Sequence, residues 1–91
     1  MSTFTHATVI VADADKAAAQ ADLGEGFFAT ALSATGAEPA THWMSSGPFE
    51  NDELSRICND AAWPRKVYFG QDWVSAIAAE GLMQVVETPE T

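Results

Sequence analysis

Basic residues are few in this 91-residue chain, and cysteine occurs only once. The single Cys58 cannot form an internal disulfide or a cysteine-cluster zinc site, so the fold must rest on its apolar core. Four Lys and Arg residues stand against 13 Asp and Glu residues, which gives a net charge of −9. Because no basic patch is present to release counterions, direct binding to nucleic acid or to an anionic membrane is not expected.

Long apolar runs are also absent. The longest strongly apolar stretch, residues 7–12, is far shorter than the roughly 20 residues that span a bilayer. No basic segment followed by an apolar one opens the chain, so no signal peptide is expected and the cytoplasm is the expected compartment. The hydrophobic fraction of 47% favours a packed core. We expect one domain over residues 1–91, with a frayed tail at residues 88–91.

Hydrophobic periodicity predicts the element order β-α-β-β-α-α-β. The predicted strands cover residues 4–11, 27–33, 40–46 and 82–87, and the predicted helices cover residues 14–22, 49–61 and 72–80. The second strand is also compatible with a helix, because Ala29, Ala31 and Leu32 are good helix formers.

Local signals refine these boundaries. Asp13 is the expected N-cap of the first helix, and Phe49 is expected to pack on Leu54 as a hydrophobic staple of the second. Gly47-Pro48 predicts a break after the third strand. Residues 67–69 are expected to form a short extended or turn segment.

This order predicts an α+β domain of the ferredoxin-like type, a four-stranded antiparallel sheet with its helices on one face. In the first strand, one face carries Thr5, Ala7, Val9 and Val11, and the other carries Phe4, His6, Thr8 and Ile10. The third strand adds to that second face either Ala40, His42 and Met44, or Thr41, Trp43 and Ser45. A half-apolar face without helices must meet solvent, a second subunit or a ligand.

Two histidines are candidates for a pocket on this face. His6 and His42 share it if the first and third strands are antiparallel neighbours, and would then give a proton shuttle or half of a metal site. No carboxylate close in sequence completes either site, so two surface histidines are the favoured interpretation. His6, His42 and Trp43 are the residues expected to line any pocket there.

The aromatic segment at residues 63–69, followed by Trp73, holds two of the four basic residues. As a binding loop it offers the residue types that dominate interface hot spots, with the candidates Trp63, Arg65, Lys66 and Tyr68. The favoured alternative is burial, in which Trp63, Phe69 and Trp73 anchor the core.

Motifs for catalysis are not visible. Cys58 shares an apolar helical stripe with Leu54 and Ala61, which indicates a structural thiol. No nucleophile elbow, phosphate loop or calcium loop is present. We therefore predict no catalytic residue, no metal and no cofactor, and we favour a protein that is not an enzyme. In length and in this lack of catalytic motifs, the chain resembles short accessory proteins of phage and prophage genomes.

Three functions fit these observations. The first is a small acidic, non-enzymatic protein-interaction module that self-associates as a homodimer or other homo-oligomer through the open sheet face, with the interface candidates Phe4, Thr8 and Ile10. The second is a ligand-binding or enzymatic ferredoxin-like dimer with a pocket near His6 and His42. The third is an acidic mimic of nucleic acid that inhibits a basic protein, using Glu50, Asp52, Glu53 and Asp60, with Arg56 interrupting the row.

Overall fold

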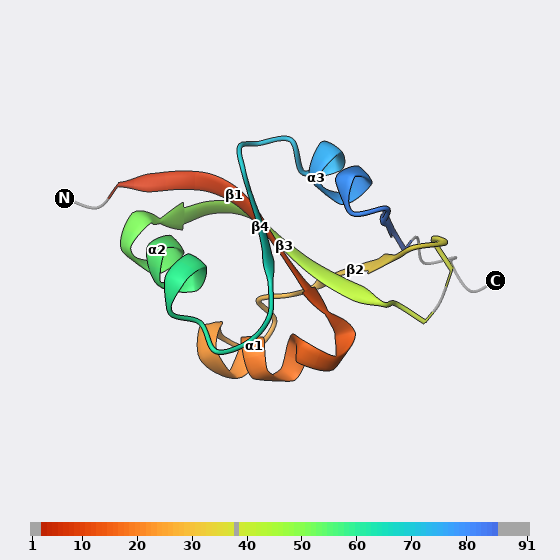
Figure 1. Ribbon diagram of the computed structural model, residues 1–91, viewed down its shortest axis with the longest axis horizontal. Coiled ribbons are helices and arrows are strands. Elements are labelled where there is room, and N and C mark those ends of the chain that lie inside the picture. Colours follow the sequence, from red (N-terminus) through yellow and green to blue (C-terminus); the bar gives the residue numbers. More distant parts are fainter. Residues whose placement is uncertain (1–2, 38, 86–91) are drawn as a thin grey trace.

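The computed structural model describes residues 3–37 and 39–85 of the chain (Figure 1). The elements follow the order β1 (Phe4–Ala12), a 3-10 turn η1 (Asp13–Asp15), α1 (Lys16–Leu23), β2 (Thr30–Ser33), β3 (His42–Glu50), α2 (Asn51–Asn59), β4 (Lys66–Phe69), α3 (Trp73–Ala79) and β5 (Met83–Gln84). The α+β class is confirmed. None of the helices in these two ranges is long and apolar enough to cross a membrane.

The sheet is antiparallel, with the strand order β4-β1-β3-β2-β5. Its centre is the long pair β1 and β3, which runs from Phe4 opposite Glu50 to Ala12 opposite His42. The prediction of four strands is wrong, because the sheet has five. The additional strand is β4, which occupies the segment expected to be extended or a turn. Four residues are too few for a periodic signal, and pairing with β1 makes them a strand.

Two strand boundaries differ from the sequence prediction. The second strand is confirmed only over Thr30–Ser33, while Phe28 before it is fully buried in the core outside any strand. The third strand passes through Gly47 and Pro48, where a break was predicted. Proline is tolerated there because β2 pairs only with residues 42–44 of β3, so at Pro48 the strand has β1 alone as its neighbour.

The helices lie on both faces of the sheet, so the prediction that they share one face is wrong. α1 and α2 cover the face that carries Ala7, Val9 and Val11, and they contribute Ala19, Leu54 and Ile57 to that core. α3 lies across the opposite face (Figure 1), where a second core contains Ile10, Leu32, Met44, Ile77 and Leu82. Five consecutive residues of β1, from Ala7 to Val11, are consequently buried. A strand covered on both faces loses its polar alternation.

Helix starts follow from local side-chain contacts. Asp13 does not cap the first helix, since its carboxylate accepts a 2.7 Å hydrogen bond from Trp43 Nε1 and α1 begins only at Lys16. In α2, Phe49 precedes the N-cap residue and shares a core cluster with Leu54, as the staple prediction requires. α3 starts after Asp72, whose carboxylate accepts from the backbone N–H of Ser75 at 3.1 Å. The last strand is confirmed at Met83–Gln84, and residues 86–91 lie outside the described ranges.

Candidate functional site

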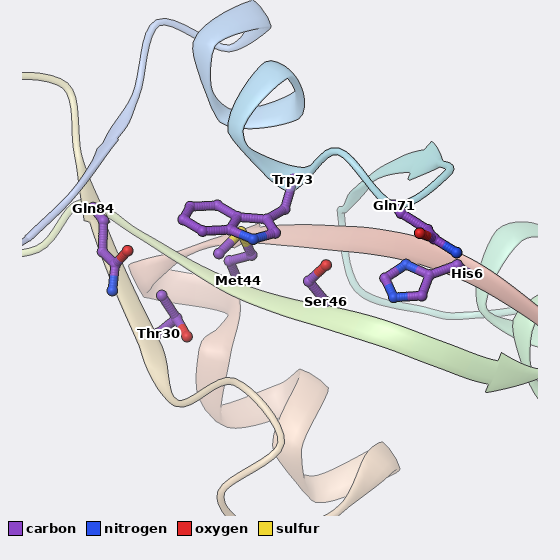
Figure 2. A pocket seen from close by; sticks show the side chains of 7 residues that line it. All are labelled: His6, Thr30, Met44, Ser46, Gln71, Trp73 and Gln84. Atoms are coloured by element: carbon purple, nitrogen blue, oxygen red, sulfur yellow. The ribbon is translucent and has the colours of Figure 1, made fainter.

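A groove of about 500 Å³ lies between α3 and the sheet, on the face opposite α1 and α2 (Figure 2). We call it the α3 groove and define it by its lining residues, which are His6, Thr30, Met44, Ser46, Gln71, Trp73 and Gln84. They come from four strands, from the turn that follows β4 and from the first residue of α3. The groove therefore depends on four of the five strands and not on one loop.

Strand register explains why these side chains meet. In the β1–β3 ladder, Thr8 lies opposite Ser46 and Ile10 lies opposite Met44, so every second residue faces α3. Thr30 pairs with Met44 from the other side and joins the same face. This register selects His42 and Met44, rather than Trp43 and Ser45, as companions of His6. Of the two sets left open by the sequence, the one with His42 and Met44 is correct for these two residues, and Ala40 lies outside β3.

His6 is held by the turn that follows β4. Its ring Nδ1 lies 3.1 Å from the carbonyl oxygen of Gly70. Because a carbonyl oxygen can only accept, Nδ1 must donate, and Nε2 of the neutral ring is left as an acceptor. In Figure 2 the imidazole lies beneath Gln71 at one end of the α3 groove.

Trp73 differs from the other two tryptophans of the chain. Trp43 Nε1 donates to Asp13 at 2.7 Å and Trp63 Nε1 donates to Asp22 at 3.1 Å, whereas Trp73 Nε1 has no hydrogen-bond partner in residues 3–37 and 39–85. No buried side-chain nitrogen or oxygen in these ranges lacks a partner, so this N–H is not a buried donor without a hydrogen bond. Figure 2 shows the nitrogen on the side of the indole that faces Ser46.

Further polar groups lie at both ends of the groove. Ser46 is exposed, and its hydroxyl is 2.8 Å from that of Thr8, which is only 1% exposed. Gln71 and Gln84 are exposed amides on opposite sides of Trp73 (Figure 2). Each hydroxyl or amide can donate and accept, so the groove is rich in groups able to bind a polar ligand.

Charge is missing from this lining. None of the seven residues that line the α3 groove is Asp, Glu, Lys or Arg, in a chain that carries 17 such residues. Nor do the described residues contain any group of three or more His, Cys, Asp or Glu side chains able to hold a metal ion. The seven described lining residues offer hydrogen bonds and apolar contact, and none of them is a carboxylate, an amine or a guanidinium.

The structure places most of the predicted binding segment in the fold's own contacts. Trp63 is only 5% exposed, and Tyr68 donates to the carboxylate of Glu80, which raises the pKa of the Tyr68 phenol. Arg65 donates to the carbonyl oxygens of Cys58, Trp63 and Ala61 at 2.6, 3.1 and 3.3 Å. Lys66 is exposed and makes no ion pair within the described residues.

His42 and Trp43 lie away from the groove. His42 pairs with Ala12 while His6 pairs with Pro48, so roughly 20 Å of strand separates the two histidines. His42 Nδ1 is 3.0 Å from the hydroxyl of Thr41. Trp43 faces the opposite side of the sheet, where Lys16 Nζ lies 3.3 Å from its ring centroid. The two histidines are not brought together into one site.

The interface candidates have unequal exposure. Phe4 is 63% exposed, whereas Thr8 and Ile10 are 1% and 2% exposed beneath the α3 side of the sheet. Only Phe4 of the three is available to a partner.

Five of the seven lining residues were not expected from the sequence to line a groove. They are Thr30, Ser46, Gln71, Trp73 and Gln84. Trp73 was expected only as a core anchor. In the structure Trp73 is half-buried and does pack against the second core, but its indole also lines the α3 groove. The remaining four are single polar residues with no pattern around them.

Comparison with known proteins adds no relative: no family model matches the chain, and neither the curated proteins nor the solved structures give a match.

Proposed function

We propose that this chain is a small non-enzymatic binding domain that holds an uncharged small ligand in the α3 groove. The observation that carries the proposal is the uncharged lining of a groove of about 500 Å³ in a chain of net charge −9. Ligand sites typically combine apolar walls with a few placed polar groups in a cleft of this size.

Electrostatics favours a neutral ligand. An anion would meet no Lys or Arg among the seven described lining residues and would be repelled by the excess of carboxylates on the chain. A cation would find no carboxylate among the seven described lining residues to replace its hydration. An uncharged polar molecule meets neither penalty and can bond to the amides and hydroxyls.

The hydrogen bonds of the polar side chains support a binding role over a catalytic one. A nucleophilic hydroxyl needs an adjacent base that a third group orients. The hydroxyl of Ser46 is bonded to Thr8, and the His6 ring donates to a backbone carbonyl and not to a carboxylate. Neither pair forms the relay that acyl transfer requires.

The test is a titration of the ¹⁵N-labelled chain with matched neutral, anionic and cationic small molecules at low and high salt. We expect neutral compounds to shift the amide resonances of Ser46, Gln71 and Trp73, with the same affinity at both salt concentrations. Gln71→Ala should weaken binding, and Gln20→Ala on α1, outside the groove, should not. Binding of charged compounds only, with a steep salt dependence, contradicts the proposal.

A second candidate is the protein-interaction module expected from the sequence. β4 forms one edge of the sheet, and its outer side pairs with no strand in the part of the chain that the structure describes. Phe69 at the end of this edge is 66% exposed. An exposed edge strand is a template for strand addition, which favours self-association at β4.

We also propose that the fold is of the ferredoxin-like type. The strand order β4-β1-β3-β2 supports two interleaved β-α-β units of the ferredoxin-like type, to which α3 and β5 are added. An experimental structure that places α1 and α2 on different faces of the sheet contradicts this type.

The acidic-mimic proposal gains one supporting contact, because Arg56 pairs with Asp22 of α1 at 2.9 Å and is thereby drawn toward α1. The mimic proposal requires that the chain capture a basic protein at low salt and that high salt abolish this binding.

A further inference from the structure

We infer that the ligand of the α3 groove is a neutral saccharide, with one ring held over Trp73 and its hydroxyls reaching the polar groups at the two ends. This inference rests on the proposed function and adds the class of ligand. The arrangement that carries it is an apolar centre between two polar ends, drawn in Figure 2.

The apolar centre is formed by two side chains. Trp73 packs against the second core, which contains Met44. Met44 is only 4% exposed, so the half-buried indole forms the accessible apolar surface (Figure 2). A saccharide ring presents C–H groups on its faces and hydroxyls around its edge. Such a ring can cover the indole while its edge remains available for hydrogen bonds.

The polar ends match the edge of that ring. His6, Ser46 and Gln71 lie on one side of Trp73, and Thr30 and Gln84 lie on the other (Figure 2). Hydroxyls and amides both donate and accept, and so does each saccharide hydroxyl. Ligands whose polar groups only accept or only donate leave part of this set unpaired.

Two groups have a fixed role and set the orientation of the ligand. Trp73 Nε1 can only donate and has no partner among the described residues, while Nε2 of neutral His6 can only accept, because Nδ1 donates to Gly70. A ligand with several hydroxyls can accept from Trp73 through one and donate to His6 through another. This donor–acceptor pair favours hydroxyl-rich ligands over purely aromatic ones.

A nucleoside is the alternative neutral ligand with a ring. Base recognition relies on stacking between aromatic faces, usually by more than one aromatic side chain. The described lining of the α3 groove provides one aromatic ring besides the imidazole of His6, and Met44 lies against it. The saccharide is therefore the better match, and nucleosides serve as the competing probe.

The experiment is calorimetric titration of the full chain with glucose, galactose, N-acetylglucosamine, lactose and cellobiose, and in parallel with adenosine and uridine. At least one saccharide is expected to bind, and neither nucleoside. Trp73→Phe keeps the ring and removes the donor, so it should weaken saccharide binding about tenfold, the value of one hydrogen bond. Gln71→Ala and Gln84→Ala remove exposed amides, so we expect the variants to keep the fold. Each should weaken binding, while Gln20→Ala should not.

The failures are distinguishable. If a nucleoside binds through the groove and no saccharide does, the proposed function stands and the saccharide inference is overturned. If no neutral compound binds, both are overturned. Saccharide binding that Trp73→Phe, Gln71→Ala and Gln84→Ala all leave unchanged places the sugar elsewhere and overturns the inference.

Discussion

Two hydrogen bonds join His6 to Gly70. The His6 ring donates to the Gly70 carbonyl at 3.1 Å, and the backbone N–H of Gly70 donates to the His6 carbonyl at 2.8 Å. Gly70 has φ of +115°, a conformation that residues with a side chain rarely adopt. The turn after β4 is thus tied to the centre of the sheet, and this contact positions Gln71 and Trp73 over the α3 groove.

Gly70→Ala should therefore affect both stability and ligand binding. A Cβ at this position meets no atom within 4 Å, so the effect comes from backbone strain of about 1–2 kcal/mol and not from a clash. Urea unfolding should show the loss, and relief of the strain should displace His6 and weaken binding. Gln71→Ala, in the same turn, is the control for stability and should unfold at the wild-type urea concentration. Equal stability of Gly70→Ala and wild type contradicts the prediction.

Arg65→Ala should destabilise the chain by about 1–2 kcal/mol, because three carbonyl oxygens lose their donor. One belongs to Cys58 in the last turn of α2, and two belong to Ala61 and Trp63 after the helix. Lys66→Ala changes the next residue, which is exposed, and should alter the free energy of unfolding by less than about 0.5 kcal/mol. Chemical denaturation of the two variants checks the difference. If both variants behave alike, Arg65 does not act through these bonds.

Acid should weaken the fold partly through Asp22. Hydrogen bonds from Arg56 and from Trp63 hold the pKa of this carboxyl below its ordinary value in the folded chain. Its contribution to stability is therefore present above the pKa of the unfolded chain, near pH 4, and is lost as the pH falls through the lower folded value. Asp22→Asn should be less stable than wild type at pH 7, and this difference should shrink toward pH 2. Thermal unfolding across this range measures it, and a difference independent of pH excludes the mechanism.

Self-association at β4 makes a separate prediction. Phe69→Glu places a charge on the exposed end of the edge strand and should convert any oligomer to a monomer. Val74→Glu is the matched control, because Val74 is 56% exposed on α3 and lies outside that edge. Light scattering over a wide concentration range reports the mass. An oligomer that survives Phe69→Glu and dissociates with Val74→Glu assigns the interface to α3 instead.

The sequence predicted the elements with strong local periodicity and missed those defined by partners. The β-branched run of β1 and the apolar stripe of α2 were identifiable because each repeats over several residues. β4 spans only Lys66–Phe69, and Pro48 continues β3 only because one neighbour is missing there. Neither fact is encoded within the segment itself.

The site was less predictable than the fold. His6 was identified from strand alternation, but its link to Gly70 crosses 64 positions of sequence. The candidates Trp63, Arg65 and Tyr68 carry the residue types of an interface, yet their polar atoms bond to the chain itself. Conversely, what distinguishes Trp73 is a hydrogen bond that it does not make to the described residues, and no sequence pattern records that.

The central claim is that the α3 groove binds a neutral ligand beside Trp73. The three indole N–H groups give three separate resonances in a ¹⁵N–¹H spectrum, two from tryptophans bonded to aspartates and one from Trp73. Titration with a neutral saccharide that binds should shift the Trp73 resonance and leave those of Trp43 and Trp63 in place. A shift of Trp43 or Trp63 with the Trp73 resonance unmoved would contradict the account.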